Sequence, residues 1–297
     1  MSIWHRSRRR RSPARSSAGT RTVLTIAGSD SGGGAGIQAD LKAFARCGVH
    51  GASAITAITA QNTVTVSAIH PIPAEIILAQ VRAVVEDIGV DAVKVGMLGT
   101  APGTLAVARA LDELPAGTPV VVDPVMVAES GARLLDDDAQ SALIAEILPR
   151  ATVLTPNLPE ARVLAGRAPD TDAAEAEEAE ALARAVLALG PSVVVLTGGH
   201  RALGSHRELA VDLFLDAQDD GPIVEIAGPR HPDGAAHGSG CTHSSLLAAQ
   251  LALGFTPLQA ARAARSLAGE AIRNGLRDVG AGAGPVDVLG LDRMRSL

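Results

Sequence analysis

Short apolar runs alternate with longer helical patterns along most of the chain. From Thr22 onward, runs rich in Val, Ile and Ala are each followed by an Ala/Leu-rich stretch with helical spacing. Such runs are typical of strands buried on both faces of a parallel sheet that helices cover. The pattern predicts strands at Thr22–Ala27, Ala54–Thr59, Ala92–Gly96, Val120–Asp123, Val153–Thr155 and Val193–Thr197. It predicts helices near Ile37–Arg46, Ala74–Asp87, Thr104–Leu111, Ala139–Leu148, Ala173–Leu189, Cys241–Leu253 and Leu258–Leu276.

One segment departs from this alternation. Leu209–Ile226 reads as two strands around the turn Gln218-Asp219-Asp220-Gly221, which predicts an antiparallel hairpin at the sheet edge. No linker-like stretch divides the chain after the first 20 residues. We therefore expect one α/β domain over residues 21–297, with a mostly parallel sheet and helices on both faces.

The first 20 residues differ from the rest. They carry six arginines among Ser, Pro and Ala, and they offer little apolar surface beyond Ile3 and Trp4. Like charges repel, so the segment is interpreted as a disordered tail. An organellar transit peptide has a similar composition and stays open as an alternative.

Composition narrows the class of protein. The net charge of −6 argues against a general nucleic-acid binder, and no apolar run is long enough to span a membrane. The two cysteines, Cys47 and Cys241, lie far apart without the spacing of metal ligands. A reducing compartment fits best, and we predict a cytoplasmic protein. Lysine is scarce, with only Lys42 and Lys94.

Two glycine-rich turns lie where strands meet helices. The first, Gly28–Gly36, lacks the third glycine of a dinucleotide fingerprint and the Lys-Ser/Thr pair of a P-loop, so a flexible turn remains an alternative. The second, His237–Thr242, precedes a helix whose first N–H groups can bind a phosphate. Cys241 would sit at the positive helix end, where a lowered thiol pKa would suit a general base. Cys241 as a merely small apolar residue is the plainer alternative.

Acidic and amide side chains follow other predicted strands. Asp123 ends one strand, and Asn157 and Glu160 are three residues apart at a helix start, where they can face one site. Carboxylates and amides near phosphates usually hold Mg²⁺ through its waters, although Asn-x-x-Glu is also a capping box. The side-chain amide of Gln61 carries both a hydrogen-bond donor and an acceptor, so it could pair with a ring nitrogen and a neighbouring amine of a heterocycle. Alternatively, it could form hydrogen bonds with the backbone of its own loop.

Taken together, the motifs resemble one family. They are Ala27-Gly28-Ser29-Asp30, Gly33–Asp40, Ala60–Thr63, Lys94–Leu98, Asp123–Met126, Ser130-Gly131, Leu134-Leu135, Thr155–Glu160, Gly198-Gly199-His200 and His237–Cys241. In this order they resemble hydroxymethylpyrimidine/phosphomethylpyrimidine kinase. The likeness runs from about Thr22 to Pro285.

The resemblance implies a ribokinase-like fold, ATP as phosphate donor, Mg²⁺ and two successive phosphorylations in thiamin biosynthesis. It also implies a homodimer. By motif, Cys241 is the catalytic base, and Gly238, Ser239 and Gly240 complete the anion hole. The residues implied at the Mg-ATP site are Asp123, Asn157, Glu160, Thr197 and Gly199, with Asp123 and Glu160 nearest the metal. Those implied for the pyrimidine are Gln61, Asp40, Gly28, Ala35, Met97 and Val125.

Three positions depart from the family pattern. Thr197 stands where lysine usually contacts the ATP phosphates, Ser239 replaces a threonine, and Asp287 stands where histidine is common. We expect Arg133 or Arg201 to supply the missing cation. Pyridoxal kinase of the same fold and a non-catalytic pyrimidine-binding protein remain as alternatives.

Overall fold

A computed structural model describes residues 19–128, 131, 134–168, 176–198, 208–219, 222–232 and 234–291. The predicted tail lies almost wholly outside these residues, as do Arg133, Gly199 and Arg201. The strands are β1 Thr22–Asp30, β2 His50–Gln61, β3 Val66–Pro71, β4 Ala92–Val95, β5 Val120–Val122, β6 Val153–Leu154, β7 Val193–Leu196, β8 Leu209–Asp216 and β9 Val224–Pro229. The α-helices are α1 Gly36–Arg46, α2 Ala74–Ala83, α3 Ala101–Asp112, α4 Asp137–Ala142, α5 Leu158–Leu164, α6 Ala176–Leu187, α7 Ser239–Ala252 and α8 Pro257–Arg273.

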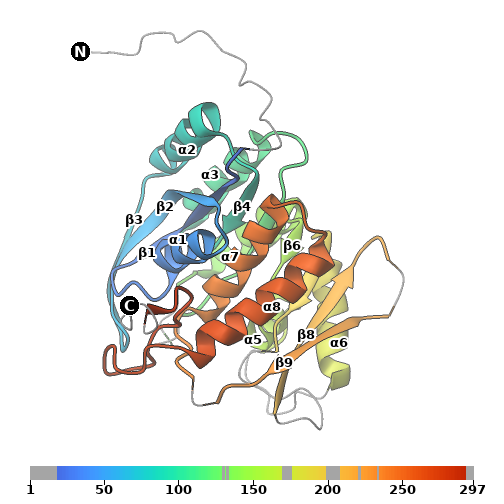
Figure 1. Cartoon of the computed structure of the whole chain (residues 1–297). Helices are drawn as coiled ribbons and strands as arrows, with labels where there is room; N and C mark the ends of the chain where they lie inside the picture. The colour runs from blue at the N-terminus through green and yellow to red at the C-terminus, as the bar shows by residue number, and fades with distance from the viewer. Residues whose placement is uncertain are drawn as a thin grey trace, which may run out of the picture.

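The strands form a single sheet in the order β3-β2-β1-β4-β5-β6-β7-β8-β9 (Figure 1). From β2 to β7 all neighbours pair in parallel. The pairs β2–β3, β7–β8 and β8–β9 are antiparallel. The predicted mostly parallel α/β fold with an antiparallel hairpin at its edge is therefore confirmed.

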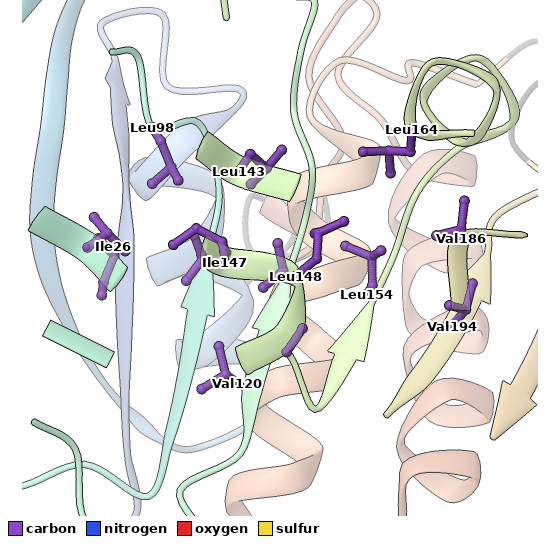
Figure 2. Packing of buried hydrophobic residues seen from close by; sticks show 14 of the residues in the cluster. Ile26, Leu98, Val120, Leu143, Ile147, Leu148, Leu154, Leu164, Val186 and Val194 are labelled. Carbon is purple, nitrogen blue, oxygen red and sulfur yellow. The ribbon is translucent and has the colours of Figure 1, made fainter. Parts of the chain in front are cut away.

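Helices cover both faces of the sheet. Helices α1, α7 and α8 pack on one face around Phe44, Phe214 and Leu246. Helices α2 to α6 pack on the other, where Leu and Ile of the helices meet strand residues such as Ile26 and Leu154 (Figure 2). Because the central strands are buried on both sides, they are almost wholly apolar, which is why the sequence pattern reveals them.

Strand β3 is absent from the sequence prediction. It pairs with β2 along the edge of the sheet, and β2 itself is longer than the predicted Ala54–Thr59. Residues of β3 are mostly exposed, so the strand carries no run of buried apolar residues that would mark it. Within the described residues, no helix combines the length and apolar character needed to cross a bilayer.

Candidate active site

A cavity of about 560 Å³ opens at the carboxyl ends of the parallel strands. This is where ligands bind in open α/β sheets. The predicted residues that line it are Gly28, Ala35, Gln61, Met97, Asp123, Val125, Asn157, Glu160, Thr197, Gly238, Ser239, Gly240 and Cys241. Gly199 falls outside the described residues, and Asp40 does not line the cavity. The fold thus brings together side chains from all parts of the sequence.

Asp40 departs from its expected role in the pyrimidine pocket. It is fully buried, and its carboxylate accepts hydrogen bonds from Thr25 Oγ1 at 2.6 Å and Ser245 Oγ at 2.7 Å. Its third partner is Lys94, whose Nζ lies 2.9 Å from Asp40 Oδ1. Asp40, Thr25 and Ser245 do not line the cavity, whereas Lys94 does, so Asp40 holds Lys94 in place and does not itself face a ligand.

Lys94 is a charged cavity residue that the sequence motifs left without a role. Its side chain is fully buried, and its Nζ also lies 3.9 Å from Asp123 Oδ2. Burial works against the charged form, yet the carboxylate of Asp40 raises the pKa of Lys94 above its usual value. Lys94 therefore places a permanent positive charge at the cavity floor. A lysine within the apolar strand Ala92–Val95 was the available signal, because a buried charge requires partners.

The two glycine-rich turns dock against each other. Gly238 caps α7 with φ +79°, and a Cβ there would overlap the carbonyl oxygen of Gly34. A Cβ at Gly34 would in turn overlap the ring of His237. Both positions need glycine for this close approach, and Gly238 also needs it for its left-handed backbone. The start of α7 is thereby held against the turn that follows β1.

The start of α7 offers N–H groups to the cavity. Ser239 N donates to Ala236 O and Thr242 N to Gly238 O. In the part of the chain that the structure describes, the N–H groups of Gly240 and Cys241 have no such backbone acceptor. Both residues line the cavity, so these groups can bind an anion there.

The pKa of the Cys241 thiol is shifted in the direction opposite to the predicted one. Burial raises the pKa of Cys241 to about 12, with the charge of Lys94 opposing and the charges of Asp123 and Asp40 adding to the rise. Sequence reasoning considered only the helix end and did not foresee two buried carboxylates near the sulfur. Without ligands, the thiol is therefore protonated at neutral pH.

Asn157 and Glu160 form the capping box that was considered as the rival interpretation. Asn157 Oδ1 accepts from Glu160 N, and Glu160 Oε2 accepts from Asn157 N, both at 2.9 Å. Both residues nevertheless line the cavity, so capping and ligand binding are compatible. Burial, together with the charge of Asp123, raises the pKa of Glu160 to about 8. Burial also raises the pKa of Asp123, against the opposing charge of Lys94.

This electrostatic arrangement fits a divalent cation. Burial and the negative charge of Asp123 raise the pKa of Glu160, an effect that a cation beside the two carboxylates would oppose, and Glu160 keeps one oxygen outside the capping box. No group of three or more His, Cys, Asp or Glu side chains among the described residues could hold a metal ion alone. A hard cation there would take its other ligands from water and phosphate oxygens.

Thr197 lies beside Asn157, so the two residues expected near the nucleotide meet. Its N–H donates to Pro156 O at 2.8 Å, and its hydroxyl lies 3.4 Å from the same oxygen. Thr197 and Asn157 form a short parallel bridge between the ends of β6 and β7. Arg133 and Arg201, predicted to replace the usual lysine here, are not among the described residues.

Gln61 marks the other end of the cavity. Its Oε1 accepts a hydrogen bond from Thr59 Oγ1 at 3.2 Å, and its side chain is half-buried. Met97 contacts the backbone of Gly28 closely, since a Cβ at Gly28 would lie 3.0 Å from the Met97 sulfur. Apolar walls with one amide group are suited to a small heterocycle.

Comparison with known proteins identifies the family. The family model described as phosphomethylpyrimidine kinase matches residues 30–287. The hydroxymethylpyrimidine/phosphomethylpyrimidine kinase of Haemophilus influenzae is 48% identical over 89% of this chain and 95% of its own. The kinase of the same name from Rhizobium meliloti is 47% identical over 90% of this chain and 96% of its own.

Solved structures agree with this result. Pyridoxal kinase from Staphylococcus aureus, in complex with pyridoxal, has a TM-score of 0.80 at 33% identity, covering 93% of this chain and 96% of its own. Phosphomethylpyrimidine kinase from Clostridium difficile has a TM-score of 0.69 at 37% identity, and the match covers 85% of this chain and 98% of its own. The chain therefore belongs to the phosphomethylpyrimidine kinase family.

Proposed function

We propose that this protein transfers a phosphoryl group from ATP to 4-amino-5-hydroxymethyl-2-methylpyrimidine, and then a second one to the monophosphate, for thiamin biosynthesis. One observation carries the proposal: Cys241 and the free N–H groups of α7 lie in the same cavity as Gln61. A small heterocycle held at Gln61 and a polyphosphate at α7 would meet at the thiol. The curated relatives carry the names of this activity.

The pyrimidine is assigned to the Gln61 end of the cavity. Gln61 can pair its amide with a ring nitrogen and the neighbouring exocyclic amine, while Gly28, Ala35, Met97 and Val125 enclose the ring. Asp40 acts here only through Lys94, which it positions.

The phosphate donor is assigned to the α7 end. A solved pyridoxal kinase of similar fold was determined with AMP-PCP, which supports ATP as donor. The N–H groups of Gly240 and Cys241 would bind the transferred phosphoryl group, whose negative charge they stabilise. Asn157 and Thr197 are assigned to the same end, and Gly199, implied there by the resemblance, lies outside the described residues. Asp123 and Glu160 would hold Mg²⁺ through its waters, and the metal would neutralise phosphate charge.

Cys241 is proposed as the base that takes the proton of the substrate hydroxyl. Its thiol is protonated in the ligand-free cavity because burial and the carboxylate charges raise its pKa. Neutralising the charge on Asp123 removes one of those causes, and Lys94 remains to favour the thiolate. The base would thus become available only once the donor site is filled.

Pyridoxal kinase is the second candidate, and one observation favours it. The solved pyridoxal kinase from Staphylococcus aureus aligns with a higher TM-score than the phosphomethylpyrimidine kinase from Clostridium difficile. The higher sequence identities belong to relatives named for the pyrimidine. The homodimer implied by the family resemblance stays a prediction. The cytoplasmic location inferred from the cysteines and the division into tail and single domain stay predictions as well.

The test is a coupled assay of ADP release with purified full-length protein, ATP and Mg²⁺. It compares hydroxymethylpyrimidine, its monophosphate and pyridoxal as acceptors. The proposal expects the highest kcat/KM with the two pyrimidines. A higher value with pyridoxal would favour the second candidate, and no ADP release with any acceptor would favour a binding protein.

A further inference from the structure

Thr59 lies next to Gln61 in the cavity wall, at the end proposed for the pyrimidine. Both residues line the cavity, and Thr59 is buried whereas Gln61 is half-buried. Strand β2 carries both residues and pairs in parallel with β1, so that Thr59 stands opposite Asp30. The hydroxyl of Thr59 therefore lies between the end of β1 and the side chain of Gln61.

The backbone of Gln61 is held by the turn that follows β1. Gln61 N donates a hydrogen bond to Ser31 Oγ at 2.8 Å, and Ser31 Oγ donates one to Gln61 O at 2.6 Å. Asp30 in the same turn contacts His237 at the start of α7. These contacts fix the main chain of Gln61 and leave its side-chain amide as the part that can still turn.

The hydroxyl of Thr59 faces more acceptors than it can serve. Thr59 Oγ1 lies 2.9 Å from Ser29 O and 3.2 Å from Gln61 Oε1, but a hydroxyl has only one hydrogen to donate. Ser29 O is a carbonyl oxygen and can only accept, so this closer contact takes the hydrogen. A half-turn of the Gln61 amide places Nε2 beside Thr59 instead of Oε1. Thr59 Oγ1 then accepts from Nε2, and both contacts become hydrogen bonds.

The orientation of the amide decides which ligand edge it can pair with. With Nε2 held at Thr59, the amide presents its donor on the side of Thr59 and its acceptor on the far side. A matching ligand carries an acceptor and a donor in the same order, as an aminopyrimidine does with its ring nitrogen and the neighbouring amine. On this ring the hydroxymethyl group stands next to the amine. The order therefore also fixes on which side of Gln61 the reacting hydroxyl lies.

We propose that Thr59 is a positioning residue that holds the Gln61 amide with its nitrogen toward Thr59 and its oxygen free for the amine of the ligand. The cavity thereby selects an aminopyrimidine over an oxopyrimidine of the same shape. Thr59 acts through Gln61 and does not touch the reacting atoms. The inference rests on the proposed function for the assignment of the pyrimidine to this end of the cavity.

The experiment measures binding by isothermal titration calorimetry on the full chain, without ATP. One probe is hydroxymethylpyrimidine, and the other is 5-hydroxymethyl-2-methyl-4-oxopyrimidine, whose ring N–H and carbonyl present donor and acceptor in the reverse order. The wild type should bind the oxo probe about tenfold more weakly or worse, because its amide then meets donor with donor and acceptor with acceptor. Thr59→Val frees the amide to turn, so the ratio of the two Kd values should fall by about threefold or more.

Two variants serve as controls for the loss of a hydroxyl. Thr59→Ser keeps the hydroxyl and should keep the wild-type ratio of Kd values. Thr104→Val is the matched change elsewhere, because Thr104 is buried in α3 and its hydroxyl donates to Thr100 O outside the cavity. It should bind both probes like the wild type. A merely structural role of Thr59 would weaken both probes by the same factor and would not change their ratio.

Two outcomes would overturn the inference. One is a wild type that binds the two probes equally, which needs no variant, and the other is a Thr59→Val variant with the wild-type ratio. A wild type that phosphorylates the aminopyrimidine but binds both probes equally would contradict this inference alone. A wild type that distinguishes the probes as expected but phosphorylates neither would contradict the proposed function alone.

Discussion

His237 Nε2 lies 3.2 Å from Asp30 Oδ2 and joins two turns that are 207 residues apart in the chain. Asp30 also accepts hydrogen bonds from the N–H groups of Gly32, Gly34 and Ala35. Burial acts to raise the pKa of Asp30, but the hydrogen bond from His237 and those from the turn hold it below its usual value. One buried carboxylate thus ties the turn after β1 to the start of α7.

Breaking this contact should impair both ends of the site. We expect His237→Leu to lower kcat about tenfold, because the amides of α7 lose their fixed place, and to raise KM for the pyrimidine, because Ala35 moves with the turn. His237→Gln, which can still donate a hydrogen bond to Asp30, should partly restore both kcat and the KM for the pyrimidine. His70→Leu, at an exposed position on β3, should behave like the wild type. Loss of kcat alone would mean that the two turns are not coupled.

Replacing the proposed base gives the second prediction. Cys241→Ala should lower kcat by about 10²-fold or more while the Kd of the pyrimidine stays nearly constant, because the thiol acts on the proton and not on binding. Calorimetry of binding and steady-state kinetics measure the two quantities. Cys47→Ala is the matched control, since Cys47 lies at the end of α1 outside the cavity. Near-normal turnover of Cys241→Ala would remove the thiol from the mechanism.

Gln61 should decide between the two candidate acceptors. Gln61→Leu leaves the polar edge of the pyrimidine unpaired, at a cost of about 1–3 kcal/mol in kcat/KM, and should affect pyridoxal less. The ADP-release assay with both acceptors measures the difference. Gln218→Leu, in the exposed β8–β9 turn, controls for loss of a glutamine elsewhere. An equal loss for both acceptors would show that Gln61 only supports the fold.

Glu160 should make stability depend on pH. The pKa of Glu160 is raised from 4.5 to about 8. Between these two pH values the folded protein keeps the carboxyl proton, whereas the unfolded chain has already released it. The free energy of unfolding should therefore fall as the pH rises through this window. Glu160→Gln can keep the capping box and should show a smaller fall in Tm between pH 5 and pH 8. The scans use metal-free buffer.

Glu75→Gln is the control for this experiment, because Glu75 is an exposed acid at the start of α2. It should leave the pH dependence of Tm unchanged. If Glu160→Gln followed the wild-type profile instead, Glu160 would titrate as an ordinary carboxyl.

The sequence predicted the structural features that short stretches of neighbouring residues determine. The buried strands could be predicted because both of their faces are apolar. The predicted cavity residues could be recognised because they lie near a strand end or in a glycine-rich turn, whereas Lys94, inside β4, was left without a role. Strand β3 could not be predicted, because its mostly exposed residues form no run of buried apolar positions. The pKa of Cys241 was misjudged because local sequence shows neither the burial of the thiol, which is the main cause of the rise, nor the charges of Asp123 and Asp40, which come from distant segments. The contact between His237 and Asp30 joins turns 207 residues apart, and no spacing within the sequence indicates it.

The most direct test of the account is to follow the products formed from hydroxymethylpyrimidine, ATP and Mg²⁺ over time by mass spectrometry. The account predicts a pyrimidine monophosphate that rises first and is then consumed as the diphosphate appears, with one ADP formed for each step. Cys241→Ala should form both products far more slowly. ADP formation without any phosphorylated pyrimidine, or faster phosphorylation of pyridoxal under the same conditions, would contradict it.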